Sequence, residues 1–215
     1  MKSNNILLQT AYLPPIQYFT KFLQNNEIII EQHDNYQKQT FRNRCHIYSP
    51  NGIQVLTVPV IKNHGTKTKV KDIKISYAEK WYINHIRSIE AAYRSSPFYE
   101  FYMPEIELIL KKKQKFLLDL NQELLAFCIE ALDLDIQINY TNEFIKASTG
   151  INDFREIIHP KRYVADHDSE FKPMNYYQCF QEKFGFIENL SIIDILLNEG
   201  PNALEILKSS ISYKK

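Results

Sequence analysis

Glycine and cysteine are both scarce in this chain of 215 residues. The five glycines form neither a GxGxxG fingerprint nor a Walker-type loop, so the two common nucleotide-binding signatures are excluded. Three cysteines, Cys45, Cys128 and Cys179, are odd in number and far apart, which favours reduced thiols over a disulfide framework. Nucleotide binding by another route stays open, and no cofactor is indicated.

Long apolar runs and an excess of one charge are lacking as well. No stretch approaches the roughly 20 apolar residues that span a bilayer, and the start, MKSNNILLQTAYLPP, is too polar and proline-rich for a signal peptide. The formal net charge of +1 gives no general attraction to nucleic acid or anionic membranes. We therefore expect a cytoplasmic protein with no membrane span and no nucleic-acid partner.

The first part of the chain predicts a strand, a helix and a second strand. Residues 6–11 (ILLQTA) are typical of a short buried strand, which Pro14 and Pro15 end. Residues 16–26 have an apolar helical face, and residues 27–32 (EIIIEQ) are β-branched. A βαβ unit of this kind favours parallel strands, with the turn after the first strand at the ligand-binding edge of the sheet.

A β-hairpin is predicted for residues 40–60. The turn SPNG, in which Asn51-Gly52 suits positive φ, joins two arms with strand-forming residues. Strand alternation divides the first arm into one face with Phe41, Asn43, Cys45 and Ile47 and another with Arg42, Arg44, His46 and Tyr48.

From residue 78 the pattern is mainly helical. Tyr82, Ile86, Ile89 and Tyr93 form a core face, Pro104 is expected to open the next helix, and residues 115–134 form an amphipathic helix. Residues 136–140 predict a strand, residues 152–175 an irregular loop, and Ser191 an N-cap. We expect an α/β fold in which an N-terminal βαβ sheet with a β-hairpin packs against a mostly helical second half. A single domain, 1–215, would comprise a mainly sheet-forming part (1–77) and a mainly helical part (78–215).

Arginine is rare, yet two arginines lie close together. The chain has six arginines against twenty lysines, and Arg42 and Arg44 are two positions apart. Two guanidinium groups on one strand face can clamp a carboxylate or phosphate, and Lys38 adds a nearby charge. The alternative is a pair of solvated arginines on the hairpin surface.

His85 follows Trp81 by one helical turn. An imidazole is the usual general acid/base, although a lone helical histidine is also a common structural residue. The histidines lack HExxH or paired spacing, so no metal site is expected. Asp194 and Asn198, at i and i+4 in an apolar segment, indicate either a buried polar network or a site wall.

Five segments carry a resemblance to the WbqC-like family of bacterial proteins, and to its Bacteroidetes-type members in particular. In chain order they are AYLPPIQYF (11–19), YQKQTFRNRCHI (36–47), LTVPV (56–60), WYINHIRSIEAAYRSSPFYEFY (81–102) and NLSIIDILLNEGP (189–201). The positions that match family motifs are Tyr12, Pro14, Tyr18, Asn43, Arg44, Pro59, Trp81, His85 and Tyr93. The chain departs from many members at Pro15-Ile16-Gln17, where they carry a glycine before YF.

The resemblance implies a role in surface-polysaccharide biosynthesis, because members occur in O-antigen and related gene clusters. Transfer of an amino-acid group such as glycine is suggested for the family, and no catalytic residues come with the resemblance.

Motifs and resemblance together predict a transferase-like enzyme with its site at the carboxyl edge of the N-terminal sheet. One wall of the site would be shaped by Tyr12, Gln17 and Tyr18. The anionic group of a small-molecule substrate would be held by Lys38, Arg42, Asn43 and Arg44. His85 would be the general acid/base, with Trp81 beside it. The alternative is a non-catalytic small-molecule-binding or assembly protein. The oligomeric state is not indicated.

Overall fold

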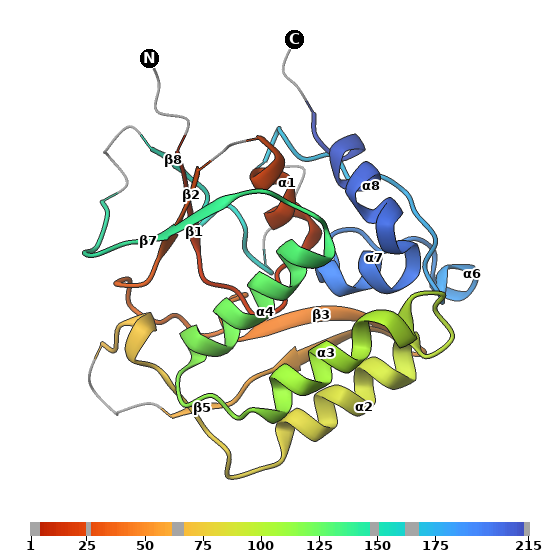
Figure 1. The fold of residues 1–215 in the computed structure, drawn as a ribbon, viewed down its shortest axis with the longest axis horizontal. Coiled ribbons are helices and arrows are strands. Elements are labelled where there is room, and N and C mark those ends of the chain that lie inside the picture. Colours follow the sequence, from red (N-terminus) through yellow and green to blue (C-terminus); the bar gives the residue numbers. More distant parts are fainter. Residues whose placement is uncertain (1–4, 25–26, 62–66, 147–150, 162–167, 213–215) are drawn as a thin grey trace.

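A four-stranded parallel sheet forms one side of the molecule (Figure 1). The structure is a computed structural model that describes residues 5–24, 27–61, 67–146, 151–161 and 168–212. The sheet order is β7-β2-β1-β8, and its strands are β1 (Ile6–Gln9), β2 (Glu27–Glu31), β7 (Gln137–Tyr140) and β8 (Asn152–Asp153). Helix α1 (Ile16–Gln24) joins the adjacent parallel strands β1 and β2, so the predicted βαβ unit is confirmed.

The second half of the chain supplies the two outer strands of this sheet. The predicted strand at residues 136–140 is present as β7, parallel to β2. Strand β8 pairs with β1 inside the segment predicted to be irregular, so that prediction was wrong at this point. Two residues are too few to show a strand periodicity, and residues 162–167 of the same segment lie outside the described ones.

The predicted hairpin consists of β3 (Arg44–Ser49) and β4 (Gly52–Thr57), which are antiparallel. Two details of the prediction were wrong. Only Gly52 of the turn has positive φ (94°), and Asn51 does not. Arg42 precedes β3 in a turn, so strand alternation applies to Arg44, His46 and Tyr48 but not to Arg42.

Helices make up most of the rest of the described chain (Figure 1). The α-helices are α2 (Trp81–Tyr93), α3 (Tyr99–Lys111), α4 (Leu117–Ala131), α6 (Gln181–Phe184), α7 (Ile192–Glu199) and α8 (Ala203–Ser209). Two 3₁₀ helices are η1 (Val70–Asp72) and η2 (Gly200–Asn202). The short strands β5 (Val60–Ile61) and β6 (Lys74–Ile75) form an antiparallel pair. The predicted core face of α2 is buried. Pro104 does not open a helix as predicted, because α3 already starts at Tyr99 and holds the proline in its second turn.

The turn after β1 is held by the segment before α7. Ile16 N–H donates to the Leu190 carbonyl (2.9 Å), and Ile192 N–H donates to the Pro14 carbonyl (2.8 Å). The Ser191 hydroxyl donates to the carbonyl of Leu13 (2.8 Å), whose φ is +42°. Ser191 therefore occupies the N-cap position, but its side chain does not cap α7 as predicted. Its hydroxyl instead stabilises a left-handed residue in the turn.

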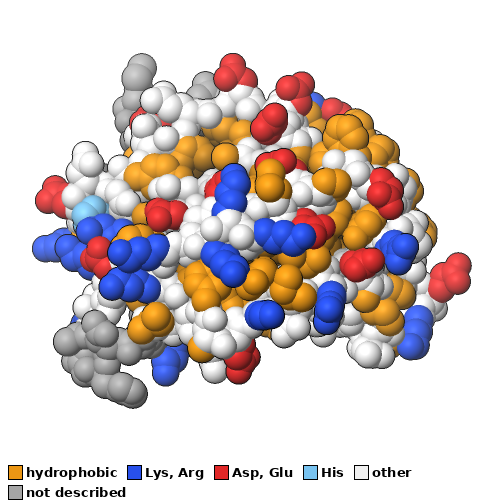
Figure 2. All heavy atoms as spheres, turned by 60° about the horizontal axis from the view of Figure 1, so that its bottom comes forward, with side chains coloured by type: hydrophobic (Ala, Val, Ile, Leu, Met, Phe, Trp, Pro, Cys, Tyr) orange, Lys and Arg blue, Asp and Glu red, His pale blue; other side chains and the backbone are white. Residues whose placement is uncertain are grey.

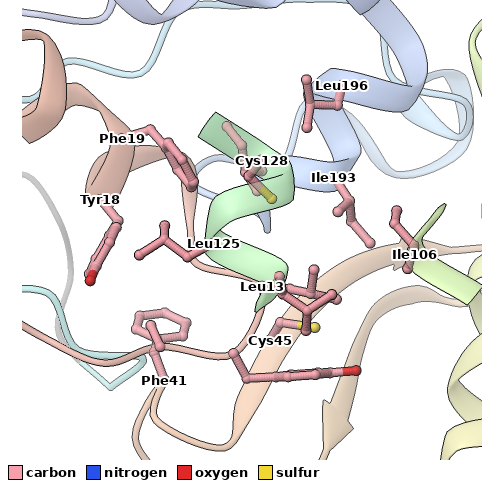
Figure 3. Packing of buried hydrophobic residues seen from close by; sticks show 14 of the residues in the cluster. Leu13, Tyr18, Phe19, Phe41, Cys45, Ile106, Leu125, Cys128, Ile193 and Leu196 are labelled. Atoms are coloured by element: carbon pink, nitrogen blue, oxygen red, sulfur yellow. The ribbon is translucent and has the colours of Figure 1, made fainter. Parts of the chain in front are cut away.

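The core joins the sheet, the hairpin and the helices. In Figure 3, Tyr18 and Phe19 of α1 lie near Leu125 and Cys128 of α4. Cys45 of β3 lies near Leu13, which belongs to the turn after β1. Burial raises the pKa of the Cys45 and Cys128 thiols, so neither is a reactive thiolate at neutral pH. Within the described ranges, no helix has both the length and the apolar character needed to cross a membrane.

Gly200 is constrained by both its backbone and its surroundings. Its φ is +54°, and a Cβ there would lie 2.5 Å from ring carbons of Phe98. Gly185 also has positive φ (+77°), but nothing lies within 4 Å of its Cβ position. We predict that Gly200→Ala lowers the free energy of unfolding by about 2–4 kcal/mol and Gly185→Ala by about 1–2 kcal/mol, measured by urea unfolding. Equal losses would show that Phe98 moves aside at no cost.

Candidate functional site

The carboxyl edge of the parallel sheet carries a buried charged network. Glu31, at the end of β2, accepts hydrogen bonds from Thr141 Oγ1 (2.9 Å) and from Arg155 Nη1 (3.3 Å). Arg155 also donates from Nη2 to Asp153 Oδ2 (2.7 Å) and from Nε to Asp153 Oδ1 (3.0 Å). Two carboxylates thus share one arginine, and its donor groups are occupied.

Arg42 lies at the same edge with most of its donors unused. The residue is 1% exposed, and its Nη2 donates to Asp34 Oδ2 at 2.6 Å. Nε and Nη1 are buried and have no hydrogen-bond partner among the described residues. Burial lowers the pKa of Arg42, and the charge of Asp34 opposes this effect. Because an unmet buried donor is costly, these two nitrogens are candidate donors to water or to a ligand.

Arg44 and Tyr36 extend this region. Arg44 begins β3, is half-buried, and has a buried Nε without a partner. Burial raises the pKa of the Tyr36 phenol to about 12, while the charges of Arg44 and Arg42 lower it. Tyr36 is therefore close to both guanidinium groups. The sequence analysis missed it as a site residue, although it opens the segment that contains both arginines.

Further buried polar atoms have no partner among the described residues. They are Gln9 Oε1, Gln24 Oε1, Asn43 Oδ1, Trp81 Nε1, Gln114 Oε1 and Asn121 Oδ1. Asn121 of α4 connects the region, since its Nδ2 donates to the Arg42 carbonyl (2.8 Å) and to Thr10 Oγ1 (3.1 Å). Buried polar groups are normally paired. Gln9 at the end of β1, Asn43 between the two arginines in sequence, and Asn121 thus offer unpaired acceptors to water or a small polar ligand.

Tyr12, Trp81 and His85 form a second group. The Tyr12 hydroxyl and His85 Nδ1 are 2.9 Å apart, and the Trp81 and His85 ring centroids are 5.0 Å apart. Burial lowers the pKa of His85 to about 4, with a smaller opposing effect from a hydrogen bond to the Thr57 backbone. The imidazole is thus neutral, enclosed and hydrogen-bonded by this protein's own groups.

Among the described residues, Gln17, Tyr18 and Lys38 form no hydrogen bond with Arg42 or Arg44. Gln17 Nε2 donates to Asp168 (2.8 Å), and its Oε1 accepts from Asn189 (3.2 Å), so its amide is engaged in joining distant segments. The buried Tyr18 hydroxyl donates to the Gln9 carbonyl (2.8 Å). Lys38 is exposed.

Lys38 belongs to a basic part of the surface. The Tyr36 N–H donates to the Thr68 carbonyl (2.9 Å), which places the exposed Lys67 and Lys69 beside the segment that leads to Lys38. Figure 2 shows lysine and arginine side chains gathered at one end of the molecule. Acidic side chains lie among them in the same view.

Asp194 and Asn198 form a buried network, one of the two alternatives left by the sequence. Asp194 accepts hydrogen bonds from the hydroxyls of Tyr93 (2.7 Å) and Tyr176. Asn198 Nδ2 donates to the Asp194 carbonyl (2.8 Å). Burial raises the pKa of Asp194 to about 6, and the hydrogen bonds oppose the rise. The network ties α2 to α7 and to the segment that follows residue 175.

Three hollows in the described surface lie elsewhere. They lie between α3, α4 and η2 (about 740 Å³), between the hairpin turn and α2 (about 500 Å³), and between α4 and β7 (about 430 Å³). No predicted site residue lines any of the three. The described residues also contain no group of three His, Cys, Asp or Glu side chains that could hold a metal ion.

The matching family model shows what kind of chain this is. The model described as the WbqC-like protein family matches residues 9–206. The chain belongs to the WbqC-like protein family. No curated protein and no solved structure matches this WbqC-like chain. The match includes the turn after β1, both arginines and the Tyr12–His85 contact.

We predict that His85 titrates with a midpoint near pH 4 instead of its ordinary value near 6.5. The cause is burial of the ring, which disfavours the imidazolium form. ¹⁵N NMR of the histidine side chains measures the midpoint, and His85→Asn assigns the signal by removing it. A midpoint at or above pH 6 would contradict the enclosed environment described above.

Proposed function

We propose that this WbqC-like protein binds the phosphate or carboxylate of a small molecule between Arg42 and Arg44 and acts as a cytoplasmic transferase. Its pathway would be surface-polysaccharide (O-antigen-type) or related small-molecule biosynthesis, and the group transferred would be an amino-acid group such as glycine. A single domain, 1–215, would contain the whole activity.

The unused donors of Arg42 carry the proposal. Arg42 and Arg155 lie at the same sheet edge. Among the described residues Arg155 forms ion pairs with two carboxylates, whereas Arg42 forms one, with Asp34, and has Glu156 as a more distant negative charge. A carboxylate or phosphate oxygen near Arg42 Nε and Nη1 would supply the missing acceptors and receive charge-assisted hydrogen bonds. The unpaired Arg44 Nε is the second donor for the same group.

Two further observations support this location. Parallel α/β sheets bind ligands outside the carboxyl ends of their strands, and Gln9, the last residue of β1, has a buried Oε1 without a partner among the described residues. The unpaired acceptors Gln9 Oε1 and Asn121 Oδ1 suit hydroxyl or ammonium donors of a ligand. An amino acid or a phosphorylated sugar carries an anionic group together with such donors.

In this proposal the backbone around the ligand is positioned by Tyr12, Gln17, Tyr18 and Asn43. Lys38 attracts the ligand, and Trp81 packs beside His85. His85 would act as the general base, because its neutral form is the one that accepts a proton. A pKa of about 4 makes it a weak base at neutral pH in the ligand-free state.

This property of His85 favours a second candidate function. A neutral, enclosed histidine whose Nδ1 lies 2.9 Å from a tyrosine hydroxyl fits a structural role equally well. The protein would then be a non-catalytic small-molecule-binding or assembly protein that uses the same arginines.

The binding test uses inorganic phosphate and glycine as probes. We predict saturable stabilisation of the wild-type chain in thermal unfolding and a loss of affinity of about tenfold or more in Arg44→Ala. Arg87→Ala, which removes an exposed arginine on α2, is the matched control and keeps wild-type affinity. Arg44→Lys keeps the charge without the forked geometry and should bind with intermediate affinity. Wild-type affinity in Arg44→Ala would show that the anion site is misplaced.

Catalysis is tested separately, by transfer of labelled glycine to glycan acceptors in cell extract. The transferase proposal predicts transfer that Arg44→Ala abolishes and that His85→Asn abolishes while phosphate binding persists. Binding without any transfer by the wild-type chain would favour the assembly function.

A further inference from the structure

The hollow between α3, α4 and η2 has a composition unlike the arginine region. Its volume is about 740 Å³, within the range of small-molecule sites. Aromatic rings from Phe101, Tyr102 and Phe127 line it together with carboxylates from Glu105 and Glu130, and Asp133 completes its acidic side. No lysine, arginine or histidine lines this hollow.

The three aromatic rings form a connected wall. Phe101 and Tyr102 pack edge-to-face with their centroids 4.8 Å apart, and the Tyr102 and Phe127 centroids are 6.3 Å apart at an interplanar angle of 76°. Phe101 is 76% exposed, which is unusual for a ring of this size. Tyr102 is only 5% exposed and lines the hollow with the other two rings.

The carboxylates are placed beside these rings by helical spacing. Glu105 follows Phe101 by four residues on α3, and Glu130 follows Phe127 by three on α4, so each carboxylate lies next to a ring on the helix surface. Asp133 lies just beyond the end of α4, where the helix terminus carries partial negative charge.

Of the other carboxylates on these helices, Glu100 and Asp119 form no ion pair among the described residues either, but two do. Glu107 pairs with Lys111, and Glu123 pairs with Lys112. Glu105, Glu130 and Asp133 form no ion pair and no side-chain hydrogen bond with any residue in the described part of the chain. The hollow therefore combines unpaired negative charge with exposed aromatic faces.

We propose that this hollow binds an organic ammonium ion, a small molecule with a cationic amine on an apolar body. A cation over an aromatic face is attracted by the ring's electrons, and the neighbouring carboxylates add Coulomb attraction. The apolar part of the ligand would contact Leu204 and the exposed ring of Phe101. The Tyr102 hydroxyl would accept a hydrogen bond from the ammonium group.

The site is separate from the proposed anion site, because it shares no lining residue with the carboxyl edge. It is therefore a second binding site of the protein, and failure of the transferase proposal would leave the ammonium-site proposal unaffected.

The test compares 2-phenylethylamine, which is cationic at neutral pH, with the neutral 2-phenylethanol of similar shape. Ligand binding to the full chain is followed by NMR shifts of amides in α3 and α4. We expect saturable binding of the amine, binding of the alcohol weaker by about tenfold, and weakening of amine binding by salt.

Charge-neutral variants locate the binding. Glu105→Gln combined with Glu130→Gln should weaken amine binding by about tenfold, while Glu107→Gln, on the same helix but outside the hollow, should leave it unchanged. Phe127→Leu should weaken it as well, and Arg44→Ala should not.

Three outcomes would overturn the proposal. They are equal binding of amine and alcohol, unchanged amine affinity in the double glutamine variant, and shifts that map outside the hollow. If a basic amphipathic peptide bound the hollow while the amine did not saturate, the site would be a protein-docking groove and the small-molecule proposal would be wrong.

Discussion

The buried charge of Arg42 is the constraint around which the carboxyl edge of this protein is arranged. Removing a guanidinium from water costs several kcal/mol unless charges and acceptors in the protein compensate, on the order of the penalty for other buried ions. Asp34 supplies one acceptor at 2.6 Å, and the backbone on either side is held by Asn121 and Thr40. Nε and Nη1 remain without acceptors. The structure thus maintains a cation that its own groups do not fully satisfy.

Contacts between distant segments hold this arrangement in place. The turn after β1 is clamped by Leu190, Ser191 and Ile192, and Ser191 N–H also donates to the His46 carbonyl of β3 (2.8 Å). The Tyr12 N–H donates to the Phe41 carbonyl (2.8 Å), which joins the turn to the segment before Arg42. The family motifs are far apart in the sequence, but in the structure they form one connected region. Substitutions in the segment before α7 would therefore act on the arginines through the backbone.

Elements with a strong local pattern could be predicted from the sequence. The β-branched run of β2 and the apolar face of α2 have periods that only one kind of element satisfies, and the hairpin turn has a glycine where positive φ is needed. The chain's membership of the WbqC-like family was also predicted and is confirmed.

Features that depend on distant partners could not be predicted. The hydroxyl of Ser191 contacts Leu13 instead of its own helix, and the amide of Gln17 contacts Asp168, 151 residues away. Alternation could not reveal that β3 starts only at Arg44, because the Asp34 ion pair and the Asn121 contact fix Arg42 in a turn. The site residue Tyr36 and the unpaired atoms around Gln9 follow from tertiary packing as well.

A crystal structure of the chain grown with inorganic phosphate tests the central claim most directly. We expect a phosphate ion whose oxygens lie about 3 Å from Arg42 Nε or Nη1 and from Arg44 Nε. If both arginines instead bond to protein acceptors or water while phosphate binds elsewhere, the account of the carboxyl edge as an anion site is contradicted.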